Sequence, residues 1–333
     1  MDIKALLSGA AVGAVLGFVF QRGRFCLNTA FRDVIYIKNF TLLRSYLLSL
    51  VIALIGANLL EQASVVSLDQ GRQEFAWLAN VLGGYIFGIG MVLAGGCAAG
   101  TLYRVGEGLV GSWMAALGFM IGAAAMKNGM LSGVYALIRS VVMVSGGGPT
   151  IHGMLGVNRW IAVAIVVVPA LFFVLTGRAS YSSSAAERHW RMTAVLVGLI
   201  IVTAWYLSGL TAGRATGISF AIPSERLLMS IVSSERLDWG TAVLIGVPLG
   251  SFAASSRANE FFWRAPRAGV VLQQFAGGLI MGLGGILAGG CLIGHGLSGL
   301  SALSISSLVA AAAMVLGSWT MVYLLFMRDE SSG

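Results

Sequence analysis

Cysteine is the residue type whose chemistry is most informative in this chain. The 333-residue sequence has three cysteines, Cys26, Cys97 and Cys291. Two of them end the same five-residue run, LAGGC, at 93–97 and again at 287–291. A thiol can act as a nucleophile, a metal ligand or a weak hydrogen-bond donor. The residues around each thiol therefore have to indicate which role is used.

Each LAGGC run places two glycines before the thiol, Gly95 and Gly96 in the first copy and Gly289 and Gly290 in the second. Glycine readily adopts the positive φ at which a helix ends. We predict that one helix ends at each glycine pair and that a short helix starts at the cysteine. The free N–H groups and the positive dipole end of such a helix start favour an anion beside the thiol.

Other cysteine chemistries fit less well. An odd number of cysteines beside apolar segments lacks the dense spacing of a disulfide framework. The sequence has no CxxC pair and its three histidines are scattered, so we predict neither a metal site nor a cofactor. His295 follows Cys291 by four residues and could share a helical face with it. A membrane sulfurtransferase with Cys291 as nucleophile and His295 as base therefore stays an alternative, as does a purely structural role for buried thiols.

Composition indicates that these motifs lie in an integral membrane protein. The chain is 57% hydrophobic and 10% charged, with a mean hydropathy of +0.88, whereas soluble domains have about 25% charged residues. The apolar stretches are continuous, which predicts helices in a lipid bilayer and not barrel strands. We expect an all-α protein with about nine transmembrane helices, within 5–20, 42–60, 76–95, 109–126, 160–177, 192–210, 241–254, 268–290 and 308–327.

Charge predicts the orientation of these spans. The net charge is +8, but the basic residues lie in short loops between apolar segments and form no basic face for nucleic acid. Residues 21–44 are rich in arginine and lysine, whereas the charged residues in 61–74 are mostly acidic. The positive-inside rule places 21–44 in the cytoplasm, and the N-terminus is then outside.

An internal repeat predicts the architecture. A shift of 194 residues (291 − 97) aligns the two LAGGC runs, and 11 of the 19 positions in 82–100 are identical to those in 276–294. We divide the chain into a first repeat at 1–130, a connecting segment with one span at 131–194, a second repeat at 195–327 and a tail at 328–333. The first spans of the two repeats would run in opposite directions. This is an inverted two-fold repeat, as in transporters whose site lies at the bilayer midplane.

A second interruption follows the first span of each repeat. In the first repeat it contains Gly23, Cys26, Asn28 and Arg32. Polar, irregular backbone at membrane depth is tolerated where protein buries it or where it lines a cavity. We therefore expect short partial helices that point inward from both repeats.

The segments RGRFCLNTAFRD, LAGGCAAGTLYRVGEG and LAGGCLIGHGLSG, in this order and spacing, resemble the YeeE/YedE family of bacterial inner-membrane transporters of sulfur compounds. The resemblance implies an hourglass-like helical fold that takes up thiosulfate. It implies that Cys26, Cys97 and Cys291 line the constricted centre and relay the ion through S–H contacts. It also implies that a small TusA-like sulfur-carrier protein can work with the transporter at the cytoplasmic face.

These lines together predict a transporter and not an enzyme. A neutral S–H group is a weak donor, which suits a site that must bind an ion and release it, whereas a thiolate would repel an anion. A related sulfur or selenium species stays open as the substrate, and so does a scaffold role for docking a sulfur carrier. The residues expected to support the thiols are Gly23, Asn28, Arg32, Gly95, Gly96, Gly289, Gly290 and His295.

Overall fold

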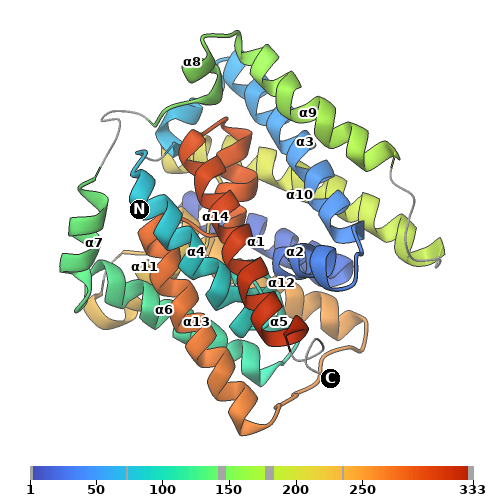
Figure 1. Cartoon of the computed structure of the whole chain (residues 1–333), viewed down its shortest axis with the longest axis vertical. Coiled ribbons are helices and arrows are strands. Elements are labelled where there is room, and N and C mark those ends of the chain that lie inside the picture. Colours follow the sequence, from blue (N-terminus) through green and yellow to red (C-terminus); the bar gives the residue numbers. More distant parts are fainter. Residues whose placement is uncertain (1–2, 73, 142–147, 177–183, 235, 329–333) are drawn as a thin grey trace.

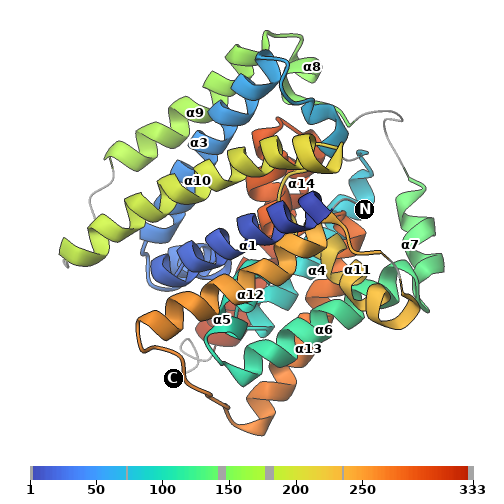
Figure 2. The same cartoon turned by 180° about the vertical axis from the view of Figure 1, so that it is seen from behind.

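The structure is a computed structural model that describes residues 3–72, 74–141, 148–176, 184–234 and 236–328 (Figures 1 and 2). Within these ranges the regular secondary structure is helical, and strand pairing is limited to two isolated bridges, Leu109 with Arg264 and Thr150 with Ser304. The expected all-α class is confirmed.

The first part of the chain forms six α-helices and one short 3-10 turn. They are α1 (Ile3–Gly23), α2 (Leu27–Tyr36), α3 (Thr41–Gln62), η1 (Leu68–Gly71), α4 (Trp77–Leu93), α5 (Ala98–Gly106) and α6 (Val110–Lys127). The connecting part adds α7 (Ser132–Arg139), α8 (Ile151–Leu155) and α9 (Arg159–Thr176).

The last part of the chain has the same alternation of long and short helices. It consists of α10 (Ser184–Ala212), α11 (Ala221–Ser233), α12 (Trp239–Arg257), α13 (Ala268–Ala288), the short π-helical segment η2 (Gly294–Gly299), α14 (Ile305–Val322) and the C-terminal turn η3 (Tyr323–Met327).

Nine helical segments of the described chain are long and apolar enough to cross a bilayer, which confirms the expected number. Two of them contain a short helix after the long one: 3–36 joins α1 to α2, and 77–106 joins α4 to α5. The protein is therefore a multi-pass membrane protein.

Long helices of the first part pack against long helices of the last part. Helix α1 packs on α12, and α3 packs on α10, which also touches α1. Helix α13 lies between α6 and α4, and α4 lies between α13 and α14. Figures 1 and 2 show α9 beside α3, along the edge of the molecule that α10 completes. The two parts are thus interleaved and share one core.

Glycine allows these helices to approach closely. A Cβ atom on Gly17 of α1 would lie 2.0 Å from the carbonyl oxygen of Val247 in α12. In return, a Cβ on Gly250 of α12 would lie 1.8 Å from the carbonyl oxygen of Ala14 in α1. Small residues give this kind of backbone contact in membranes, where apolar side chains gain little by leaving lipid. The same explanation covers most of the glycines in α4 and α13.

The two ends of α1 mark the two faces of the molecule. Ala5, near its start, lines a cavity, and we call this end of the molecule the cavity face. Gln21, near its end, hydrogen-bonds Glu107 and Glu260. A 21-residue helix is about 30 Å long, so these groups are at opposite ends. We call the second one the Arg24 face, after the arginine that pairs with both carboxylates.

The close contact of α1 with α12 gives a stability test. We expect Gly17→Ala to force the two backbones apart and to lower the free energy of unfolding by about 1–3 kcal/mol, the usual cost of overpacking. Gly269→Ala is the matched control, because nothing lies within 4 Å of that position. Thermal unfolding of the purified protein in detergent measures both. Equal melting temperatures for the two variants would contradict this packing.

Candidate functional site

Both LAGGC runs break a helix at the first glycine. Helix α4 ends at Leu93 and Gly95 has a φ of 73°, while α13 ends at Ala288 and Gly289 has a φ of 89°. These are left-handed values, which side chains with a Cβ rarely adopt. A short helical stretch then begins directly after each cysteine. The predicted break at the glycine pair is confirmed in both copies.

The two cysteines after these breaks cap the short helices in the same way. The N–H of Gly100 donates to the sulfur of Cys97 at 3.4 Å, and the N–H of Gly294 donates to the sulfur of Cys291 at 3.4 Å. In each case the donor is three residues after the thiol, at the usual position of an N-cap contact. The two copies therefore hold their sulfur atoms in equivalent positions at a helix start.

Cys26 lies beside Cys97, the residue that caps α5. Cys26 occupies the N-cap position of α2, and its sulfur lies 4.0 Å from the sulfur of Cys97. A Cβ on Gly100 would come within 2.5 Å of the Cys26 sulfur, so the two thiols meet over a glycine surface. The structure thus brings two of the three predicted residues into contact.

Cys291 has a different neighbour. Its sulfur accepts the N–H of Phe220 at 3.3 Å and lies 3.9 Å from the hydroxyl of Ser219. Phe220 occupies, under the 194-residue shift, the position of Cys26. The site therefore consists of a thiol pair around Cys97 and a separate thiol around Cys291.

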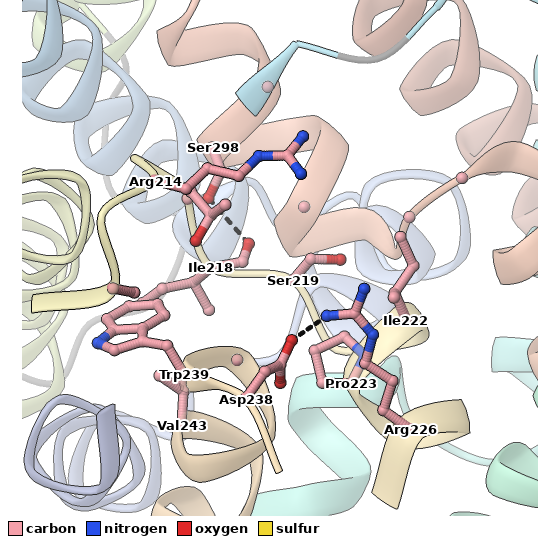
Figure 3. Close-up of a pocket in the computed structure, with 18 of the residues that line it drawn as sticks. Arg214, Ile218, Ser219, Ile222, Pro223, Arg226, Asp238, Trp239, Val243 and Ser298 are labelled. Carbon is pink, nitrogen blue, oxygen red and sulfur yellow. Dashed lines mark hydrogen bonds and ion pairs between the residues drawn. The ribbon is translucent and has the colours of Figure 1, made fainter. Parts of the chain in front are cut away.

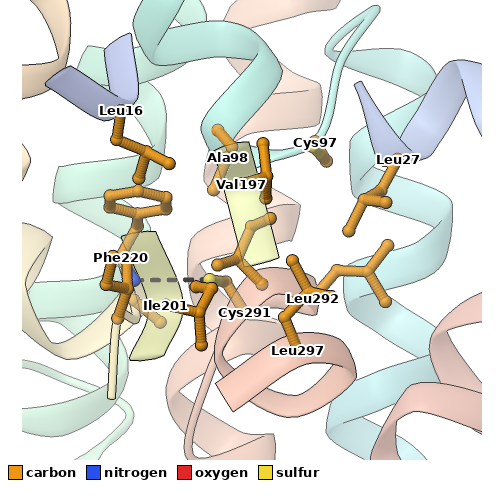
Figure 4. Packing of buried hydrophobic residues seen from close by; sticks show 14 of the residues in the cluster. Leu16, Leu27, Cys97, Ala98, Val197, Ile201, Phe220, Cys291, Leu292 and Leu297 are labelled. Atoms are coloured by element: carbon orange, nitrogen blue, oxygen red, sulfur yellow. Dashed lines mark hydrogen bonds between the residues drawn. The ribbon is translucent and has the colours of Figure 1, made fainter. Parts of the chain in front are cut away.

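Apolar side chains surround all three thiols. Cys26, Cys97 and Cys291 are each no more than 2% exposed and belong to one hydrophobic cluster. Figure 4 shows Cys97 and Cys291 within this cluster, together with Leu16, Leu27, Ala98, Val197, Ile201, Phe220, Leu292 and Leu297. We call these eight side chains the apolar barrier. In this conformation no thiol is open to solvent.

A cavity of about 940 Å³ leads toward Cys291 from the cavity face. Its lining includes Gly290, Gly294 and Ser219, all next to Cys291. Basic side chains outnumber acidic ones in the lining: Arg72, Lys127, Arg139, Arg214 and Arg226 against Glu74 and Asp238. Figure 3 shows Arg214 and Arg226 with Ser219 between them. An excess of positive charge in a partly enclosed space attracts anions.

His295 lies at the floor of this cavity. It is 1% exposed, its Nδ1 lies 3.1 Å from the hydroxyl oxygen of Ser307, and its Nε2 has no hydrogen-bond partner. A Cβ on Gly290 would be 3.0 Å from that Nε2. The described hydrogen bonds of the Cys291 sulfur involve Phe220, Gly294 and Ser219, and none of them involves the imidazole of His295.

The remaining predicted residues lie on the Arg24 side of the barrier. Asn28 is 3% exposed in the first turn of α2, and its Oδ1 has no hydrogen-bond partner. Gly23 contacts Thr193 closely, where a Cβ would lie 2.3 Å from the side chain. Arg32 pairs with its neighbour Asp33 and is not brought to the thiols.

Two clusters were missed by the sequence reasoning. On the Arg24 face, Arg24 forms ion pairs with Glu107 and with Glu260, which joins the end of α1 to α5 and to the segment after α12. On the cavity face, Arg214 and Arg226 line the cavity. Arg214 and Arg226 lie in the part of the second repeat expected outside the cytoplasm, where the positive-inside rule predicts few arginines. Arginines on that side were the sequence signal that could have identified this cluster.

Asp238, which lines the cavity, gives a pH test. It caps α12 by accepting hydrogen bonds from the N–H and hydroxyl of Thr241, and it pairs with Arg226. Burial opposes its ionisation, but the Thr241 hydrogen bonds and the Arg226 charge outweigh burial, so the pKa of Asp238 lies below its usual value. A carboxyl with a lowered pKa stabilises the fold above its usual pKa of about 4, and this contribution is lost as the pH falls.

We therefore expect Asp238→Ala to destabilise the protein by about 1 kcal/mol at pH 7, and by less below about pH 4. Thermal unfolding at both pH values measures the difference. Asp238→Asn, which keeps a capping side chain, is the control for the charge alone. A penalty for Asp238→Ala that does not change with pH would show that the carboxylate charge has no part in it.

Comparisons with known proteins show the family to which the chain belongs. The family model described as "Sulphur transport" matches residues 22–320. The chain is 36% identical to the thiosulfate transporter TsuA of Escherichia coli K12, over 98% of this chain and 96% of that protein. It is 37% identical to the thiosulfate transporter TsuA of Spirochaeta thermophila, over 96% and 99%. A probable transporter, YedE of Escherichia coli K12, is 32% identical over 33% of this chain and 27% of its own length. The chain belongs to the YeeE/YedE family of sulfur transport proteins.

Proposed function

We propose that the protein carries thiosulfate across the bacterial inner membrane, through the region where its two halves meet. The observation that carries this proposal is the cavity: it is rich in basic side chains and leads to the residues around Cys291. The two relatives that match nearly the whole chain are named thiosulfate transporters. Thiosulfate is a compact dianion, and it fits both the charge and the volume of this space.

The cavity is the first binding region in this proposal. Several of its cations are partly neutralised, since Arg226 pairs with Asp238 and Lys127 pairs with Glu225. Arg139 has no acidic partner among the described ion pairs, and its guanidinium lies 3.5 Å from the carbonyl oxygen of Leu287, the first residue of the second LAGGC run. An anion drawn into the cavity is thus directed toward Cys291.

Protonated thiols then pass the ion onward. The sulfur atoms of Cys97 and Cys291 accept backbone N–H groups, and these contacts do not use the S–H proton, so each thiol can donate to an anion. A weak donor suits repeated binding and release. His295, with its free Nε2 beside Gly290, supplies a further hydrogen bond at the cavity floor.

The two halves form an inverted repeat in this proposal, with repeats at 1–130 and 195–327 joined by 131–194. Under the 194-residue shift α1 corresponds to α10, α3 to α12, α4 to α13 and α6 to α14. The helix contacts repeat under this correspondence. The contact of α1 with α12 corresponds to that of α10 with α3, and the contact of α4 with α14 corresponds to that of α13 with α6. Movement of one repeat against the other would open the apolar barrier to the Arg24 face.

Orientation and partner complete the proposal. The N-terminus and the cavity face are outside, and the Arg24 face is in the cytoplasm, where a small TusA-like sulfur-carrier protein would receive the product of uptake. A related sulfur or selenium anion as the substrate is distinguished by competition with labelled thiosulfate.

The thiols of the two LAGGC runs give the direct test of this function. We expect Cys97→Ala and Cys291→Ala each to reduce thiosulfate uptake to background, and Cys26→Ala to reduce it less. Growth on thiosulfate as the sole sulfur source and uptake of labelled thiosulfate measure this, with the melting temperature as a check of folding. Full uptake by both LAGGC variants would refute the thiol pathway. A persulfide on Cys291 during uptake, detected by mass spectrometry, would support the sulfurtransferase instead.

Two open positions allow the orientation to be measured. Gly133 on α7 and Gly269 on α13 have no atom within 4 Å of an added Cβ, and they lie on the cavity face and the Arg24 face respectively. We expect a membrane-impermeant maleimide to label Gly133→Cys in intact spheroplasts and Gly269→Cys only after lysis. The three native thiols are buried and provide the unlabelled background. The opposite labelling pattern would reverse the orientation.

A further inference from the structure

We propose that Arg104 forms, with Cys26 and Cys97, a second anion site on the Arg24 side of the apolar barrier. This inference rests on the proposed function and adds to it a residue that supplies positive charge after the ion has left the Cys291 region. The transport path then has two positively charged sites, one on each side of the apolar barrier.

The Arg104 side chain lies beside the first LAGGC run. It lies in α5, and its Nη1 donates to the carbonyl oxygen of Gly95 at 2.5 Å. A Cβ on Gly96 would be 2.9 Å from the same nitrogen. The guanidinium therefore lies against the two residues that precede Cys97, and Cys97 touches Cys26. Cation and thiol pair belong to one cluster.

The charge of Arg104 has no acidic partner among the described ion pairs, although an acidic residue lies nearby. Glu107 is three residues further along the chain, but its carboxylate pairs with Arg24 and accepts a hydrogen bond from Gln21. Arg104 instead stacks over the ring of Tyr103, with 5.6 Å to its centroid. A half-buried cation held by a carbonyl and an aromatic ring keeps its full charge available for an anion.

The surroundings offer hydrogen bonds to the same anion. Helices α2 and α5 both begin at this cluster, after Cys26 and Cys97, and the free N–H groups of a helix start favour negative charge. Gly95 is exposed and Arg104 is only partly buried, so the site lies close to solvent on its own side of the barrier.

The second repeat does not reproduce this site. Ser298 stands at the position that corresponds to Arg104, and Phe220 stands at that of Cys26. At the second LAGGC run the cation comes from another element, since Arg139 of α7 reaches the carbonyl of Leu287. Each LAGGC run thus has one arginine at a carbonyl of its break, supplied from different parts of the chain.

Uptake kinetics of Arg104 variants test the proposal. We expect Arg104→Gln to lower the maximal rate of thiosulfate uptake at least about tenfold and to change KM by less than about twofold, because the ion first binds in the intact cavity. Arg104→Lys should keep at least about a third of the rate, because it keeps the charge. Arg257→Gln, which removes an exposed arginine from the end of α12 on the same face, is the matched control and should transport like the unaltered protein.

Arg104→His gives a second readout, which also applies if the glutamine variant does not fold. Its uptake relative to the unaltered protein should rise as the pH falls through about 6.5, where imidazole becomes charged. The inference is overturned if Arg104→Gln transports like Arg257→Gln, if folded Arg104→Lys is as slow as Arg104→Gln, or if the histidine variant shows no gain at low pH. Absence of thiosulfate uptake by the unaltered protein would instead refute the proposed function.

Discussion

A helix that breaks at membrane depth needs hydrogen-bond donors for the carbonyl groups that the break sets free, because lipid supplies none. At the first LAGGC run Arg104 donates to the carbonyl of Gly95 and Thr101 donates to that of Gly96. At the second, the amide of Asn80 donates to the carbonyl of Ala288 and to Ser306. Asn80 belongs to α4, on the opposite half of the chain. The second break therefore gets this donor only when the two halves are assembled, and the glycine-lined contacts between α4 and α13 make that assembly possible.

This constraint explains why polar residues are placed so unevenly in an apolar chain. A buried amide or guanidinium without a partner costs several kcal/mol in hydrocarbon. Asn80 and Arg104 occur where carbonyl groups need donors, and the apolar barrier is built from leucine, valine, isoleucine, alanine and phenylalanine. The thiol is intermediate between these classes, since it packs as an apolar group and still donates a hydrogen bond. Cysteine can therefore lie inside the barrier at little cost when no anion is present.

Much of this arrangement could be predicted from sequence, for reasons that particular residues make clear. Gly95 and Gly289 made the helix breaks predictable, because a glycine pair that precedes a cysteine in two apolar segments indicates a helix end. The nine spans followed from continuous hydropathy. The resemblance implied that the three thiols line one centre, but which two sulfur atoms touch was not predictable, since the contact of Cys26 with Cys97 depends on how α2 meets α5 across 71 residues of chain. Pairing of Glu107 with Arg24, and not with the neighbouring Arg104, likewise depends on tertiary packing.

The one-sided cavity has an electrical consequence. The cavity extends from one face almost to Cys291. When it is hydrated, the membrane potential falls mainly across the short apolar barrier beyond it. Moving one elementary charge across 100 mV is worth about 2.3 kcal/mol, hence about 4.6 kcal/mol for a dianion. In a cell with a negative interior, inward passage of such an ion is opposed by that amount over the distance between Cys291 and the Cys26–Cys97 pair. Net accumulation then requires that the cell remove the ion chemically on arrival, or that another gradient drive the step.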